Sequence, residues 1–270
     1  MRDPVPLGCY GNKYLELKRI REFLGDCKPR TFVEPFCGSA VVARAMYDLD
    51  PTVRVHINDL EEHRIGFYQI LADDEKRRAW REYEHAVIDG GKAAYRAICC
   101  EKTLAGFVIP KRIYSFTYGV FPAEEKALIR KKAPVADGWV RFLKHATITC
   151  RDWRAVADEY KDDATALIFL DPPYFSSDNS TYRRYTADGR FTDSTQIYLD
   201  LLDFLRTAKA RVFMIINDTA LLRHLYGEYA SPPYEKAYSN TVGATRQKNK
   251  TTHMFVSNFW GATSPLPPPS

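Results

Sequence analysis

The sequence predicts an α/β protein with a doubly wound, mostly parallel sheet and an inserted, mainly helical domain. Short apolar runs alternate with helical patterns in the first and last parts of the chain, the alternation breaks between them, and polar residues follow several apolar runs directly. The 270 residues, 45% of them hydrophobic, are enough for one full core with a smaller appended domain. Such sheets bind ligands at the carboxyl ends of their strands, so the residues there are the first candidates for function.

The first expected elements are a helix and two strands. A helix is expected over residues 13–24, because apolar side chains recur there at helical spacing and Gly25 ends the pattern. A short strand is expected at 31–33. After the turn EPFCGS, a helix through about Leu49 leads to a second strand, VRVHIN, which ends at Asp59.

The alternation then stops and resumes late in the chain. Segment 64–141 is rich in helix formers and aromatic residues, so we assign it as an inserted domain. The later expected elements are strands at 146–150, 166–170 and 211–216, an amphipathic helix carrying Ile197, Leu201 and Leu205, and two strands around Tyr238 and Phe255. We therefore predict one domain from 1–63 with 142–262, the insert at 64–141, and a disordered tail at 263–270. We expect no internal repeat.

Composition argues against membrane and metal proteins. No run of about eighteen apolar residues is present, and the start of the sequence does not have the pattern of a signal peptide, so we expect a soluble, intracellular protein. The six cysteines form no C-x-x-C pair and no spacing with histidine that suits zinc. We expect reduced structural thiols and no metal.

Positive charge is concentrated in one part of the predicted insert. Residues 92–132 hold nine Lys or Arg against three Glu, a local balance of +6, whereas the whole chain carries +5. A basic segment is typical of polyanion binding. Charge alone favours the plainer interpretation, a solvated helical surface.

The strongest chemical signal is Asp171-Pro172-Pro173-Tyr174, directly after the apolar run ALIFL. A strand-ending turn would also explain it, since Asp often starts turns and Pro stops ladders. A chemical role fits all four residues: the Asp171 carboxylate and the Pro172 carbonyl can accept the two hydrogens of an aromatic amine such as that of adenine, aiming its lone pair. Tyr174 offers a ring on which an extruded base can stack.

A second signal lies in FVEPFCGSA, residues 32–40. Gly38 would let the backbone approach a ligand closely, and the following helix start favours negative groups. A glycine turn after a first strand is more often plain architecture. The signal is strengthened by Asp59, which ends the next expected strand, where an acidic side chain typically binds ribose hydroxyls.

Together these motifs resemble the D12 class of adenine-specific DNA methyltransferases, the group that contains the bacterial DNA adenine methyltransferase. The resemblance covers roughly 8–75 and 140–260, and its motifs occur in the order of that family. They are YGNKY (10–14), FVEPFCGSA (32–40), IND (57–59), CRDW (150–153), DPPY (171–174) and YTADGRFT (185–192). The resemblance implies a Rossmann-like methyltransferase fold, S-adenosylmethionine as cofactor, and an adenine flipped out of double-stranded DNA as substrate.

The resemblance also implies residue roles. Asp171, Pro172 and Tyr174 would be catalytic. The residues implied to bind the cofactor are Tyr10, Lys13, Phe36, Gly38, Asp59, Asp152, Trp153 and Asp171. In this family the insert reads the target sequence and the loop after DPPY closes over the base. With the interleaved basic and aromatic pattern of 104–121, this gives as expected DNA contacts Lys111, Arg112, Tyr114, Tyr118, Arg183, Arg184, Tyr185 and Arg246.

Some positions depart from the family pattern. The usual Gly-Gly-Lys is Gly11-Asn12-Lys13, the usual second glycine of the turn is Ala40, and a late glutamate is missing beside the basic run that begins at Arg246. The insert matches the family pattern weakly.

Alternative functions remain open at this stage. The same chemistry on RNA is one alternative, and a catalytically inactive relative that only binds DNA is another. Methylation of a protein glutamine is disfavoured, because such enzymes generally carry Asn-Pro-Pro-Tyr where this chain has Asp171. A restriction endonuclease is a candidate partner. We expect the protein wherever its target DNA resides, in cytoplasm, nucleoid or a viral replication site.

Overall fold

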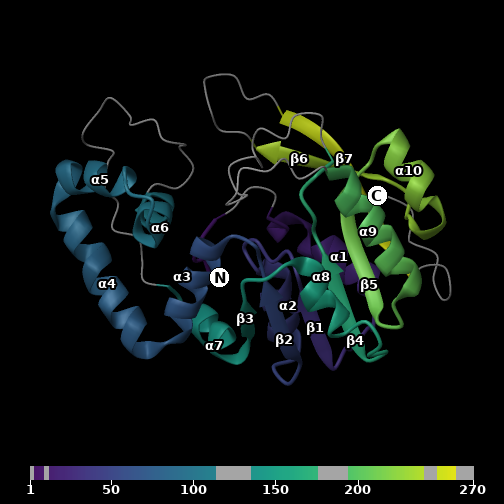
Figure 1. The fold of residues 1–270 in the computed structure, drawn as a ribbon, viewed down its shortest axis with the longest axis horizontal. Helices are drawn as coiled ribbons and strands as arrows, with labels where there is room; N and C mark the ends of the chain where they lie inside the picture. Colours follow the sequence, from purple (N-terminus) through teal and green to yellow (C-terminus); the bar gives the residue numbers. More distant parts are fainter. Residues whose placement is uncertain (1–2, 9–11, 114–134, 176–193, 240–247, 260–270) are drawn as a thin grey trace. The chain divides into compact units, whose positions relative to one another are not determined.

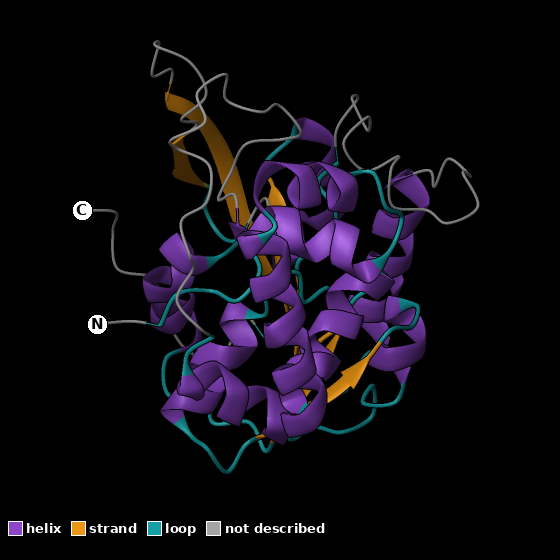
Figure 2. Ribbon diagram, turned by 90° about the vertical axis from the view of Figure 1, so that its left-hand side faces the viewer, coloured by secondary structure: helices purple, strands orange, loops and turns teal. Residues whose placement is uncertain are grey.

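The structure is a computed structural model that describes residues 3–8, 12–113, 135–175, 194–239 and 248–259. Its described strands form a seven-stranded, mostly parallel sheet with flanking helices, which confirms the predicted α/β fold class (Figures 1 and 2). The strand order is β3 (Thr147–Thr149), β2 (Arg54–Asn58), β1 (Thr31–Glu34), β4 (Ala166–Leu170), β5 (Arg211–Asn217), β7 (Lys248–Ser257) and β6 (Tyr234–Ser239). The chain divides into two compact units, 1–21 with 37–152 and 22–36 with 153–270.

The first unit combines a parallel strand pair with helices. Strands β2 and β3 pair in register from His56↔Thr147 to Asn58↔Thr149. The helices are α2 (Val41–Leu49), α3 (Glu62–Ala72), α4 (Asp74–Asp89), α5 (Gly91–Cys99), α6 (Leu104–Ile113) and α7 (Asp137–His145). Helix α3 is central to this unit and packs against α4, α6, α7 and β3. Its buried positions recur at helical spacing, at Ile65, Phe67, Tyr68 and Leu71.

Most of the described part of the predicted insert is helical, but its predicted boundaries do not mark the ends of elements. Residue 64 lies inside α3 and residue 141 lies inside α7. Helices α4, α5 and α6 share a small apolar cluster of their own, made by Val87, Tyr95, Ile98 and Ile109. Because the unit also contains β2 and β3, the division into two separate domains at 64 and 141 stays a prediction.

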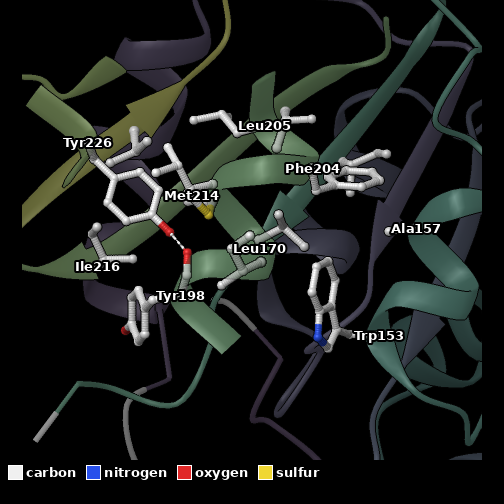
Figure 3. Packing of buried hydrophobic residues seen from close by; sticks show 14 of the residues in the cluster. Trp153, Ala157, Leu170, Tyr198, Phe204, Leu205, Met214, Ile216 and Tyr226 are labelled. Atoms are coloured by element: carbon white, nitrogen blue, oxygen red, sulfur yellow. Dashed lines mark hydrogen bonds between the residues drawn. The ribbon is translucent and has the colours of Figure 1, made fainter. Parts of the chain in front are cut away.

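The second unit contains the remaining five strands. Strand β4 is fully buried and pairs in parallel with β1 and with β5, as the continuous apolar run ALIFL predicts for a central strand. Helices α8 (Trp153–Asp158), α9 (Ser194–Thr207) and α10 (Ala220–Tyr226) bury their apolar side chains against β4 and β5 (Figure 3). Phe213 of β5 stacks on Phe23 of α1 (Leu17–Leu24), and the two ring centroids are 4.7 Å apart.

The expected helix over 13–24 is shorter in the structure, because it begins as a 3-10 turn, η1 (Tyr14–Glu16), before α1. A second 3-10 turn, η3 (Gly227–Tyr229), follows α10.

Strands β6 and β7 form an antiparallel ribbon at one edge of the sheet. The second half of the ten-residue strand β7 pairs with β5, ending at Asn217↔His253, and its first half pairs with β6, from His253↔Tyr234 to Lys248↔Ser239. The ribbon therefore extends past the carboxyl end of β5. It places His253 at the edge where the strands of a parallel sheet bind ligands.

Candidate active site

The loop Asp171–Tyr174 begins where β4 ends, as its sequence predicted. Asp171 and Tyr174 are half-buried, and Pro172 is buried. The loop is tied at its far end. The backbone N–H of Phe175 donates to the Tyr198 hydroxyl and to Asn217 Oδ1, both at 3.2 Å, and Asn217 Nδ2 donates to the Phe175 carbonyl at 2.9 Å. These bonds fix the backbone just beyond Tyr174.

The Tyr198 hydroxyl also holds the middle of this loop. It donates to the Pro173 carbonyl at 3.1 Å, and Tyr198 is 1% exposed. Its backbone carbonyl accepts a hydrogen bond from the Tyr226 hydroxyl, the dashed line in Figure 3. Burial raises the pKa of Tyr226 well above its ordinary value, so this phenol stays a neutral donor.

The Tyr174 ring lies against the antiparallel ribbon. Its centroid is 5.1 Å from the imidazole of His253, which is fully buried on β7, and that imidazole makes an edge-on contact of 5.8 Å with Tyr234. Aromatic contacts at these distances limit how far a ring can tilt. Tyr174 is thus held from one side, and the residue is half-buried.

In the first unit, the turn at Gly38 is bonded to the end of β2. The Gly38 N–H donates to Asp59 Oδ2 at 2.8 Å, and the Gly38 carbonyl accepts from the Tyr68 hydroxyl at 2.8 Å. Gly38 has φ +47° and Ala40 has φ +54°, in the left-handed region that glycine adopts most easily. Glycine would adopt the backbone conformation of Ala40 with less strain.

We expect Gly38→Ala to weaken cofactor binding at least tenfold. A side chain at φ +47° costs roughly 1–2 kcal/mol, and it would fill the space in which backbone can approach a ligand. Isothermal titration with S-adenosylmethionine measures the affinity. The control is Ala40→Gly, which changes the neighbouring left-handed position in the relaxing direction. An unchanged affinity for Gly38→Ala would show that the turn does not face the cofactor.

The other predicted cofactor residues are divided between the two units, and Lys13 and Asp152 belong to the first. Lys13 is 2% exposed, and the turn beside it is held by Asn12 Oδ1, which accepts from the Tyr14 N–H at 3.1 Å. Asp152 is exposed after β3. In the second unit Phe36 and Trp153 stack with centroids 5.7 Å apart. Tyr10 lies outside the described residues.

The expected DNA contacts include one correction. Arg112 is 5% exposed, its Nε donates to Glu84 Oε1 at 2.6 Å, and its Nη1 donates to the Pro6 carbonyl at 2.9 Å. A guanidinium engaged in this way does not face DNA, so we withdraw Arg112 from the DNA surface. Lys111 lies on the backbone of α6. Outside the described residues are Tyr114, Tyr118, Arg183, Arg184, Tyr185 and Arg246.

The described residues contain no group of three or more His, Cys, Asp or Glu that could hold a metal ion. Within the same ranges, no helix is both long and apolar enough to cross a membrane. The described cysteines are free thiols, and burial raises the pKa of Cys150, helped by the carboxylates of Glu62, Asp59 and Glu61. Cys150 is therefore a poor thiolate nucleophile.

A model of the D12 class N6 adenine-specific DNA methyltransferase family matches residues 10–97 and 113–241. The chain belongs to this family. Membership implies S-adenosylmethionine as the methyl donor in general and DNA adenine as the group that is methylated.

Two named relatives are similar to this methyltransferase over most of its length. It is 25% identical over 274 residues to the Type II methyltransferase M.CviBI of Paramecium bursaria Chlorella virus NC1A, covering 92% of this chain and 97% of that one. It is 25% identical over 281 residues to the Retron Ec67 DNA adenine methylase of Escherichia coli, covering 92% and 89%. The solved structure of an antibiotic related methyltransferase matches at 11% identity over 89% and 92% of the chains, and its TM-score of 0.33 decides nothing.

Sequence reasoning missed the residues that hold the DPPY loop of this methyltransferase. Asn217, Tyr198 and His253 are buried or half-buried on three different elements. Asn217 and Tyr198 stand in no motif singled out for function, and His253 was noted only at the end of the basic run that begins at Arg246. One signal was available. The segment Ile216-Asn217-Asp218 repeats the letters of Ile57-Asn58-Asp59, and both end a strand.

Proposed function

We propose that this DNA adenine methyltransferase transfers a methyl group from S-adenosylmethionine to the N6 amine of an adenine extruded from double-stranded DNA. The observation that carries the proposal is the placement of Asp171–Tyr174 at the carboxyl end of a central parallel strand, with the backbone tied on both sides of Tyr174 by Tyr198 and Asn217. A loop held in this way suits a group that must aim a weak nucleophile.

The residues at the proposed binding site suit S-adenosylmethionine. S-adenosylmethionine supplies an electrophilic methyl group when bound. Gly38, with its positive φ, allows close approach of the backbone, and the Asp59 carboxylate at the end of β2 suits ribose hydroxyls. We assign the methionine moiety to Tyr10, Lys13, Phe36 and Gly38, the ribose to Asp59, and the adenine ring to Asp152 and Trp153, with Asp171 also touching the methionine amine.

The protein's part in the chemistry is to orient the adenine amine. Its lone pair is delocalised into the ring, so it is a poor nucleophile. Asp171 and the Pro172 carbonyl accept the two amine hydrogens and favour tetrahedral geometry at nitrogen. No strong general base is required, because the amine becomes acidic once methylated and loses its proton late.

The DNA surface of this proposal comprises Lys111 and the predicted contacts outside the described residues. Phosphate contacts by the lysine and the arginines of this set would make binding steeply dependent on salt. A restriction endonuclease partner stays a prediction of the sequence.

The test of this function is direct. Purified protein is incubated with labelled S-adenosylmethionine and unmethylated genomic DNA, and the methylated positions are mapped at base resolution. We expect N6-methyladenine at one short recognition sequence. A parallel reaction with RNA tests the main alternative. Label in RNA alone, or cofactor binding without label in either polymer, would overturn the proposal.

We expect Tyr174→Ala to lower kcat/KM at least tenfold and Tyr174→Phe to retain most activity. Stacking of a base on an aromatic ring contributes about 1–3 kcal/mol, comparable with the few kcal/mol lost on unstacking the target. A duplex with 2-aminopurine at the target position reports extrusion as a fluorescence rise when protein is added. Equal fluorescence and rate for Tyr174→Ala and wild type would exclude the stacking role.

A further inference from the structure

One eight-residue pattern occurs twice in this chain, at the ends of two parallel strands. The pattern Ile-Asn-Asp followed by four residues and Arg covers 57–64 and 216–223. Asn58 is the last residue of β2 and Asn217 is the last of β5, and a helix, α3 or α10, follows each. Each unit of the molecule contains one copy.

The aspartate and arginine of each copy lie close together, but only those of the second copy are hydrogen-bonded to each other. Asp59 Oδ2 lies 3.9 Å from Arg64 Nε, and Asp218 Oδ2 accepts from Arg223 Nη2 at 2.6 Å. In both copies the arginine stands five residues after the aspartate and lies on the helix that follows. In the second copy this hydrogen-bonded ion pair closes the turn between strand and helix.

The first asparagine clamps one residue of the loop beyond the neighbouring strand. Asn58 Nδ2 donates to the Arg151 carbonyl at 2.8 Å, and Asn58 Oδ1 accepts from the Arg151 N–H at 2.9 Å. Asn58 is fully buried, and its Oδ1 also accepts from Thr149 Oγ1 at 2.8 Å. The clamped residue directly precedes Asp152 and Trp153.

The second asparagine makes the same two bonds in the other unit. Asn217 Nδ2 donates to the Phe175 carbonyl at 2.9 Å, and its Oδ1 accepts from the Phe175 N–H at 3.2 Å. Phe175 follows the end of β4, the parallel neighbour of β5, and directly follows Tyr174. Each asparagine thus grips the N–H and the C=O of a single residue.

Only a side-chain amide can make this pair of bonds well. It presents one acceptor and one donor in one plane, as a peptide group does, and so adds a rung of backbone-like pairing where the ladder has ended. Asp keeps the acceptor and loses the donor, Ser is too short to span both atoms, and Gln is one methylene too long for the same geometry. These hydrogen bonds are partly buried, so the position of the amide side chain restrains the backbone that it holds.

We infer that Asn58 and Asn217 are positioning residues with separate tasks. Asn217 fixes the 171–175 loop, so that Asp171 and Tyr174 meet the adenine, and Asn58 fixes 150–153, so that Asp152 and Trp153 meet the cofactor. The inference rests on the proposed function for the identity of those ligands. The clamps themselves are defined by hydrogen bonds within the protein.

The first experiment compares Asn58→Ala with Asn217→Ala by hydrogen exchange of the protein without ligand. Asn217→Ala should speed exchange in peptides covering 171–175 and leave 150–153 protected, and Asn58→Ala should do the reverse. Each variant is the control for the other. Faster exchange in both segments from either variant, or in neither, would overturn separate clamps. Hydrogen exchange does not depend on activity, so it tests whether the clamps exist even if the wild-type protein fails to methylate DNA. Such a failure would count against the proposed function and not against the clamps.

The second experiment separates the two tasks by kinetics. A displacement of about 1 Å in a reacting group typically lowers the rate a hundredfold. Asn217→Ala should lower kcat at least tenfold at saturating cofactor and leave the Kd for S-adenosylmethionine within threefold of wild type. Asn58→Ala should raise that Kd at least tenfold and leave kcat within threefold. If both variants lose kcat and affinity in the same proportion, the asparagines only support the fold.

A third pair of variants guards against misfolding. Asn217→Asp and Asn58→Asp keep the size of the side chain and the acceptor, and a protonated carboxyl regains the donor. A carboxylate facing a carbonyl prefers its protonated form, so the turnover of Asn217→Asp relative to wild type should rise as the pH falls. Asn217→Ala should show no such rise. The same ratio at every pH for Asn217→Asp would contradict the clamp.

Discussion

Asp171→Ala should abolish methyl transfer while leaving the affinity for DNA within a few-fold of wild type. Asp171 follows the central strand β4 and is half-buried. In the proposed function its carboxylate acts on the amine and the cofactor and not on phosphates. Loss of one charge-assisted hydrogen bond in such a site typically costs about 2.7–4 kcal/mol, a hundredfold or more in rate. Transfer of labelled methyl to DNA and a DNA-binding titration measure the two quantities.

The matched control is Asp162→Ala in the same unit. The Asp162 side chain is 76% exposed and pairs with Lys209, whose side chain is 72% exposed. The Asp162→Ala variant removes the same negative charge as Asp171→Ala and should leave the rate of methyl transfer unchanged. Asp171→Asn should be milder than Asp171→Ala, because an amide oxygen still accepts one hydrogen. More than a tenth of wild-type turnover in Asp171→Ala would rule out its assigned role.

Glu84→Ala should lower the free energy of unfolding by about 3–5 kcal/mol, because it leaves the buried Arg112 guanidinium without its carboxylate. The pair joins α4 to α6, and Arg112 also holds the Pro6 carbonyl. Urea unfolding followed by circular dichroism measures the loss. Glu84→Gln retains an acceptor and should be less damaging.

Asp162→Ala again serves as the control, since an exposed ion pair contributes about 0–1 kcal/mol. A loss for Glu84→Ala no larger than that of Asp162→Ala would mean that Arg112 finds water or another partner. In that case Arg112 would return to the candidates for DNA binding.

Most of the sheet was predictable from the sequence because its strands are continuous apolar runs. The run ALIFL is buried at all five positions, and a continuous apolar run of this length is typical of a parallel strand that is covered on both faces. The antiparallel direction of β6 and β7 was not predicted. The direction of a strand depends on how the chain connects it to its neighbours. The sequence located these two strands only by their centres at Tyr238 and Phe255, which does not give their direction.

The site was predictable where a motif carries the chemistry and not where a side chain only supports it. Asp171 follows a strand in an unusual tetrapeptide. Asn217 stands at a strand end, where asparagine ordinarily indicates a turn. The pattern shared by 57–64 and 216–223 is too short to count as an internal repeat, so a search for repeated supersecondary structure does not find it.

Arg112 was misplaced for a different reason. It lies in the basic segment 92–132, where a charged residue is normally solvated. Its partner Glu84 is 28 positions away on another helix. No local pattern connects the two residues, so only the packing of α4 against α6 identifies the pair.

The pairing of β1 with β4 has a consequence for synthesis of the chain. Strand β1 ends at Glu34, and its parallel partner begins at Ala166, roughly 130 residues later. At about 5–20 residues per second, a ribosome needs some 6 to 26 s to supply that partner. Until then β1 has β2 but not β4 beside it, so Phe32 and Val33, fully buried in the finished protein, lie on a strand with one edge unpaired. Nascent chains should therefore be most prone to aggregation, and most dependent on chaperones, while residues 37–152 are being made.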